Sequence, residues 1–128
     1  MSIEIVQYRT MMQMTESVRS AVCKMGHSDR GKYHLRAVAA GSGAYKLRSC
    51  IVLFYNGIPV GWNALYYDSF CSPTFNDTHC SVFVLDEYRR RGFGGMLMKD
   101  GFRRWKQRFN PIVHAAQQEY WYKLQNKS

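Results

Sequence analysis

The sequence lacks any apolar run that approaches the ~20 residues a membrane-spanning helix needs. Its first residues, Met1 to Ile5, include an acid and no basic segment, so we expect no secretory signal peptide. It also contains no internal repeat, no low-complexity stretch and no segment typical of an interdomain linker. These absences predict one cytoplasmic domain over residues 1–128, because ordinary domains contain roughly 100–200 residues.

Closely spaced cysteine pairs are absent as well. The four cysteines, Cys23, Cys50, Cys71 and Cys80, form no CxxC pair, whereas structural zinc sites usually bring their ligands in such pairs. Reduced thiols are the expected state of a chain without a secretory signal. The sequence therefore predicts neither a disulfide framework nor a bound metal.

Acidic residues are scarce, since nine Asp and Glu stand against eighteen Lys and Arg, giving a formal net charge of +9. The basic residues concentrate between Arg89 and Arg108, where Asp100 is the single acid. Such a surface favours anionic partners: nucleic acid, a phosphorylated cofactor or an acidic protein. Charge alone does not choose among these three.

Hydrophobic spacing in the first third of the chain predicts a strand followed by helix. Ile3, Ile5 and Tyr8 indicate a short strand, and apolar residues at spacings of three and four indicate a helical stripe over residues 11–25. Residues 28–46 are polar and contain glycine, which we interpret as a second short helix and a loop.

Three strong strand patterns follow, at residues 50–55, 58–67 and 79–85. Asn56-Gly57, between the first two, is the strongest two-residue hairpin signal because both turn positions need positive φ. The sequence therefore predicts an antiparallel meander in the middle of the chain.

The last third predicts a helix over about residues 94–108, a strand over residues 112–116 and a closing helix over residues 117–126. The helix carries an apolar stripe that we expect to be buried: Met98, Phe102, Trp105 and Phe109. The element order is then β-α-(α)-β-β-β-α-β-α. A meander that leads into a strand–helix–strand crossover predicts a mixed sheet, in an α/β or α+β domain.

A glycine loop joins the strand at residues 79–85 to the following helix. Unpaired amides at a helix start, together with the helix dipole, favour an anion, and glycine lets the anion approach. The nucleotide P-loop is excluded because no Gly-Lys-Ser/Thr occurs, and the GxGxxG fingerprint is excluded because position 97 is Leu. The loop therefore predicts a phosphate site of another kind.

The residues from Val84 to Leu97 read VLDEYRRRGFGGML, with an Arg-x-x-Gly-x-Gly core that begins at Arg89. This segment closely resembles motif A of the GNAT superfamily of acyl-CoA N-acyltransferases, V-x-P-x-Y-R-x-x-G-x-G-x-x-L, with Asp86 at the proline position. The hairpin from Asn56 to Gly61 is similar to the family's turn between its second and third strands. The resemblance covers about residues 48–116, and residues 1–47 by element order.

The resemblance implies a GNAT-like fold and acetyl-CoA as acyl donor, with a primary amine attacking the thioester directly. It implies that a strand lies beside the pantetheine of the cofactor, namely Phe83, Val84 and Leu85. It also implies that the loop amides hold the pyrophosphate, which assigns cofactor binding to Arg89, Arg90, Arg91, Gly92, Phe93, Gly94 and Gly95. The positive field would help to attract this phosphorylated cofactor.

The sequence departs from the family pattern towards its end. The family often has Asn seven residues before a Tyr that acts as general acid, but Ala115 stands seven residues before Tyr122. Tyr120 and Tyr122 are both candidates for the acid, and His79 is a candidate base or proton relay. The chain ends near residue 128, so we expect the family's usual sixth and seventh strands to be absent.

A second hypothesis is a degenerate GNAT-fold binding module that acts without catalysis. Its basis is the basic segment of residues 89–108 with interspersed aromatics, which would bind nucleic acid or a protein partner. A homodimer is a further expectation, because absent strands leave a sheet edge that can pair. The acceptor amine stays open among a small molecule, a peptide N-terminus, a protein lysine and an aminoacyl group.

Overall fold

The computed structural model describes residues 2–25, 45–68, 78–105 and 112–113. Its strands form one sheet in chain order: β1 (Ile3–Tyr8), β2 (Tyr45–Tyr55), β3 (Ile58–Asp68), β4 (Thr78–Val84) and β5 (Ile112–Val113). The first four strands are antiparallel neighbours, and β5 runs parallel to β4. The predicted meander and the mixed sheet are both confirmed.

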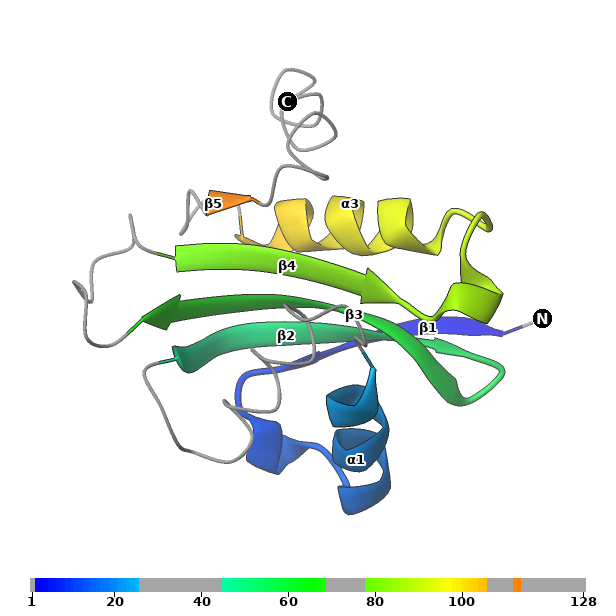
Figure 1. The fold of residues 1–128 in the computed structure, drawn as a ribbon, viewed down its shortest axis with the longest axis horizontal. Coiled ribbons are helices and arrows are strands. Elements are labelled where there is room, and N and C mark those ends of the chain that lie inside the picture. Colours follow the sequence, from blue (N-terminus) through cyan, green and yellow to red (C-terminus); the bar gives the residue numbers. More distant parts are fainter. Residues whose placement is uncertain (1, 26–44, 69–77, 106–111, 114–128) are drawn as a thin grey trace.

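The two α-helices of the described residues cover opposite faces of this sheet, as Figure 1 shows. They are α1 (Glu16–Lys24), which follows the 3-10 turn η1 (Met11–Gln13), and α3 (Phe93–Trp105), which follows the 3-10 turn η3 (Asp86–Tyr88). Helix α3 is the crossover between β4 and β5. None of the helices in the described ranges is long and apolar enough to span a bilayer.

The first helix is shorter than its apolar stripe predicted. Met14 is extended, with φ −77° and ψ 143°, and the Thr15 hydroxyl accepts a hydrogen bond of 3.3 Å from the amide of Val18. This N-cap starts the helix at Glu16, because a capping residue itself has non-helical backbone angles. Met11 and Met14 are nevertheless buried, so the stripe identified core residues correctly but overestimated the helix.

The predicted hairpin turn at Asn56-Gly57 is confirmed by φ values of 51° and 81°. Strand β2 begins at Tyr45, earlier than expected, and it occupies the end of the segment interpreted as helix and loop. The rest of that segment and the closing helix at residues 117–126 lie outside the described residues.

Alternating residues of the central strands supply two cores. Ile51 and Leu53 of β2 face α3, whereas Cys50 and Val52 face α1. The predicted buried stripe of α3 is confirmed for Met98, Phe102 and Trp105, which are 3%, 8% and 2% exposed; Phe109 lies outside the described residues. The sheet is thus buried on both faces, with α3 anchored over β3.

Candidate functional site

The sheet opens at the C-terminal end of β4. On one side, β3 pairs with β4 along its length, from Tyr67 opposite Thr78 to Gly61 opposite Val84. On the other side, β5 pairs only with His79 and Cys80. Within the described part of the chain, β4 therefore has no strand partner on this side from residue 81 to residue 84.

The register decides which backbone groups face that opening. The amide of Leu85 donates to the carbonyl of Val60 at 2.9 Å, so these two residues form a hydrogen-bonded pair. Because such pairs alternate with non-bonded pairs along an antiparallel ladder, the backbone groups of Phe83 point towards β3. Those of Val82 and Val84 point towards the opening; the Val84 carbonyl accepts from Arg89 Nε at 2.9 Å, so a ligand could pair with the Val84 amide and with Val82.

The loop between η3 and α3 turns its amides outwards. Arg90 and Gly92 both have positive φ, 65° and 84°, and the amide of Met96 donates to the carbonyl of Gly92 at 3.0 Å. Among the described residues, the amides of residues 90–94 have no hydrogen-bond acceptor. Successive amides of this kind, with the positive end of a helix dipole behind them, favour binding of an anion.

A pocket of about 400 Å³ joins the open edge of β4 to this loop. Both walls come from the segment that the sequence singled out, one from β4 and one from the start of α3. The residues that line the pocket are Val82, Phe83, Val84, Tyr88, Arg89, Arg90, Gly92, Phe93 and Gly94. An extended ligand with an anionic group would therefore meet strand backbone at one end and unpaired amides at the other.

The two glycines that line the pocket have different reasons to be glycine. Gly92 has φ 84°, a conformation that side chains rarely adopt. Gly94 has no such constraint, and a Cβ there would meet only the Val84 side chain, at an ordinary 4.0 Å. Since packing does not require glycine at position 94, its bare backbone fits the close approach of a ligand.

The three arginines of the loop have different surroundings. The Arg89 guanidinium donates from Nε to the carbonyl of Val84 at 2.9 Å, and its Nη1 lies 2.7 Å from Asp86 Oδ1. Arg91 lies over the rings of Tyr88 and Tyr55, at 5.1 and 5.9 Å from their centroids. Arg90 makes no side-chain hydrogen bond or ion pair with the described residues. Arg89 thus stabilises the loop through these two contacts, whereas Arg90 is exposed at the pocket.

Most of the residues expected to bind a cofactor lie together in this pocket. Seven of the ten line it. Leu85 and Arg91 lie within the same stretch of chain and Gly95 directly follows it, but these three do not line the pocket. Val82 and Tyr88 also line it and were not expected. Tyr88 could have been found, because it stands at the tyrosine of the motif; Val82 could not, because its outward backbone depends on the strand register.

The catalytic candidates are less well defined. His79 lies in β4, opposite Tyr66 of β3 and Ile112 of β5, about 10 Å along the strand from Val82. Tyr120 and Tyr122 lie outside the described residues. The described ranges also bring together no group of three His, Cys, Asp or Glu side chains that could hold a metal ion.

Solved structures with a similar arrangement include three that are distant in sequence. Escherichia coli ElaA is 14% identical, with a TM-score of 0.63 over 95% of this chain and 85% of its own. A ribosomal-protein-alanine N-acetyltransferase from Brucella melitensis biovar Abortus 2308 is 12% identical, with a TM-score of 0.54 over 98% and 90%. The aminoglycoside acetyltransferase AAC(6')-Iy, solved with a CoA-containing bisubstrate analogue, is 14% identical, with a TM-score of 0.53 over 97% and 90%.

These likenesses establish the GNAT-like fold. Among curated protein sequences, none is significantly similar to this chain. The model of the acetyltransferase (GNAT) family, however, matches residues 17–119, which include the whole pocket. The protein belongs to the GNAT family of acetyltransferases.

Proposed function

We propose that this chain is an N-acetyltransferase that moves the acetyl group of acetyl-CoA to a primary amine. The observation that carries this proposal is the pocket in which the unpaired amides of residues 90–94 adjoin the open edge of β4. The pyrophosphate of the cofactor would bind at these amides, with Arg90 supplying further positive charge. The pantetheine would lie along the outward backbone groups of Val82 and the amide of Val84.

The amine attacks the thioester carbonyl directly in this proposal. A C–N bond forms as the C–S bond breaks, the amine loses a proton to a base, and the leaving CoA thiolate takes up a proton. A strand amide that points into the opening is the kind of donor that stabilises the oxyanion, worth on the order of 3 kcal/mol in acyl transfer. His79 as base, and Tyr120 or Tyr122 as acid, are the candidates for the two proton transfers.

The alternative hypothesis, a nucleic-acid-binding module, is weakened by the burial of its aromatic side chains. Its aromatic residues would have to stack on bases. Phe93, Phe102 and Trp105 are instead only 4%, 8% and 2% exposed, because they pack α3 onto the sheet. We therefore favour the acetyltransferase.

Thermal melting with and without acetyl-CoA tests the proposal, with CoA as a second ligand and ATP as a phosphate control. A ligand at ~100 times its Kd adds about 2.7 kcal/mol, which raises the Tm by several degrees at this size. We expect a shift with acetyl-CoA and CoA that is larger than with ATP. An equal shift with ATP, or none with CoA, would contradict the proposal.

The variant Gly94→Ala gives a sharper test of the proposed CoA site. Replacing a glycine of ordinary backbone conformation by alanine typically raises stability by about 0.4–1 kcal/mol. The same Cβ would intrude where the cofactor approaches, so we expect Gly94→Ala to keep or raise the Tm while losing the CoA-induced shift, and Gly94→Glu to lose that shift entirely. Release of CoA thiol with a panel of amines would then identify the acceptor.

A further inference from the structure

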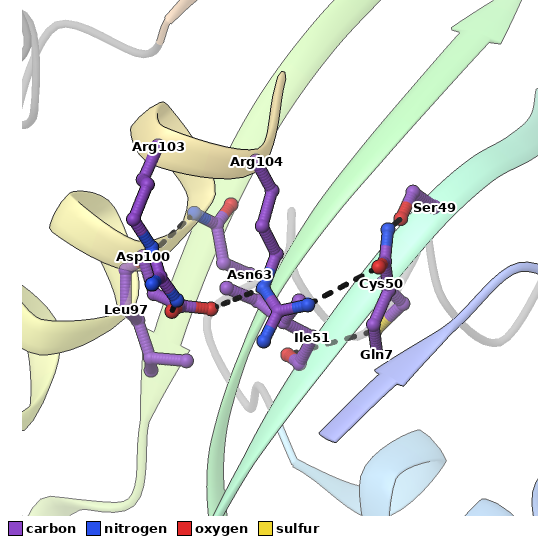
Figure 2. Close-up of polar contacts among 9 residues, drawn as sticks. All are labelled: Gln7, Ser49, Cys50, Ile51, Asn63, Leu97, Asp100, Arg103 and Arg104. Carbon is purple, nitrogen blue, oxygen red and sulfur yellow. Dashed lines mark hydrogen bonds and ion pairs between the residues drawn. The ribbon is translucent and has the colours of Figure 1, made fainter. Parts of the chain in front are cut away.

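A fully buried amide side chain joins β3 to α3. Asn63 is 0% exposed, and its Nδ2 donates a hydrogen bond of 3.0 Å to the carbonyl of Leu97 (Figure 2). In a regular helix that carbonyl already accepts from the amide of Gly101. Burying an amide in an apolar core is costly unless it is hydrogen-bonded, so this hydrogen bond offsets the cost of burying Asn63 and fixes the direction of the contact.

Asn63 lies between the two walls of the pocket. On the sheet it stands directly opposite Val82 of β4, whose backbone faces the opening. On the helix its partner, Leu97, is less than one turn beyond Gly94, which lines the pocket. Asn63 therefore adds a directional contact between the sheet and the start of α3 to the apolar packing of the helix.

Two glycines allow α3 to lie close to the sheet. A Cβ on Gly101 would come within 2.6 Å of Asn63 Nδ2 and 2.8 Å of the Trp105 ring. A Cβ on Gly61 would come within 2.8 Å of the carbonyl of Phe83 and 3.1 Å of Leu97 Cδ1. The helix can therefore sit at this height only while both positions lack a side chain.

A second polar connection joins α3 to the sheet farther from the pocket. Asp100 pairs with Arg103 and Arg104, and Arg104 Nη1 donates to Gln7 Oε1 at 3.2 Å. Gln7 Nε2 in turn donates to Ser49 Oγ at 2.9 Å (Figure 2). The contact between Arg104 and Gln7 is exposed, so water competes for it, and it provides a comparison for the buried one.

We propose that Asn63 is a positioning residue for cofactor binding, because it holds the amides of residues 90–94 at the correct distance from the open edge of β4. The inference rests on the proposed function, since it concerns the affinity of that pocket for CoA. It assigns to Asn63 an effect on CoA binding beyond its effect on stability.

Calorimetric titration of CoA into the full chain tests this proposal with Asn63→Leu, which removes the donor at similar volume. We expect its Kd to rise about tenfold, because small misplacements of binding groups are costly. Val22→Ala, on the fully buried face of α1, controls for lost stability, and Gln7→Ala removes the remote connection. We expect both controls to stay within about twofold of the wild-type Kd.

Gly101→Ala gives an independent variant, because it disturbs the same contact from the helix side, and we expect it to raise the Kd as well. If Asn63→Leu does not fold, Gly101→Ala decides the question. If the folded test variant binds CoA with a Kd within about twofold of wild type, or if Val22→Ala raises the Kd equally, the inference about Asn63 is overturned and the proposed function is not affected. Absence of CoA binding by the wild-type protein would overturn the proposed function and this inference together.

Discussion

The face of the sheet under α3 and the face under α1 are packed differently. Under α3, the core contains the buried amide of Asn63, Gly61 lies close to the Phe83 carbonyl, and Gly101 lies close to the Asn63 side chain. Under α1, the core is formed by methionine, valine, cysteine and aromatic side chains, among them Met14 and Trp62. Among the described residues, the indole Nε1 of Trp62 has no hydrogen-bond partner, and the same holds for Trp105 on the α3 face, so the faces differ in Asn63 and the glycines and not in their indoles.

This difference separates two tasks. Flexible side chains such as Met fill space and tolerate small displacements of the helix. The hydrogen bond from the Asn63 side chain to the Leu97 carbonyl tolerates less, because its strength depends on distance and angle. The face beside the pocket that we propose for the cofactor is thus the one with the buried side-chain hydrogen bond. Substitutions on the two faces should therefore affect stability and CoA binding in different proportions.

Removing one large buried side chain from each face should have the largest effect. Leu97 and Met14 are 0% and 3% exposed, and truncation of either to Ala should cost about 2–5 kcal/mol of unfolding free energy. We expect Leu97→Ala also to weaken CoA binding, because Leu97 lies against Gly61 beneath the pocket. Urea unfolding and CoA titration measure both quantities; an equal loss of affinity in Met14→Ala would contradict the division between the faces.

Gly61→Ala should have a smaller effect on stability and a clear one on binding. The added Cβ would lie 2.8 Å from the carbonyl of Phe83, so β3 and β4 must part or α3 must rise. Overpacking of this kind costs roughly 1–3 kcal/mol. Gly57→Ala is a matched control for loss of glycine: its φ of 81° makes it costly too, but it lies in the hairpin turn with nothing within 4 Å of the added Cβ. CoA affinity should fall for Gly61→Ala and remain unchanged for Gly57→Ala.

Local patterns in the sequence predicted much of this arrangement. Asn56-Gly57 predicted the turn because its positive φ values are a local requirement, and the stripe of Met98, Phe102 and Trp105 predicted which side of α3 is buried. The pocket segment was identified because its residues are consecutive along the chain. In each case the information lies within a few neighbouring residues.

What the sequence did not reveal depends on contacts between distant segments. Asn63 read as an ordinary residue of a strand, and its role appears only when Leu97 lies beside it. Val82 was missed because the alternation of its backbone groups follows from the pairing with β3. The length of the first helix was overestimated because the stripe of residues 11–25 records burial, whereas the Thr15 cap sets the start.

Cys50 provides the smallest test, on the α1 face. Complete burial raises the pKa of its thiol from 9.0 to about 12, with a further contribution from Cys23. In the unfolded chain the thiol ionises near its ordinary pKa of 9.0, so above that pH the unfolded state binds fewer protons than the folded state. The contribution of Cys50 to stability is therefore complete below that pKa and is lost as pH rises towards 12, by about 1.4 kcal/mol per pH unit.

Cys50→Ala removes this linkage, so the stability difference between wild type and variant should shrink by about 1–2 kcal/mol between roughly pH 8 and pH 10. Urea unfolding at both pH values measures it, and a difference that does not change with pH would mean that the thiol ionises inside the folded core.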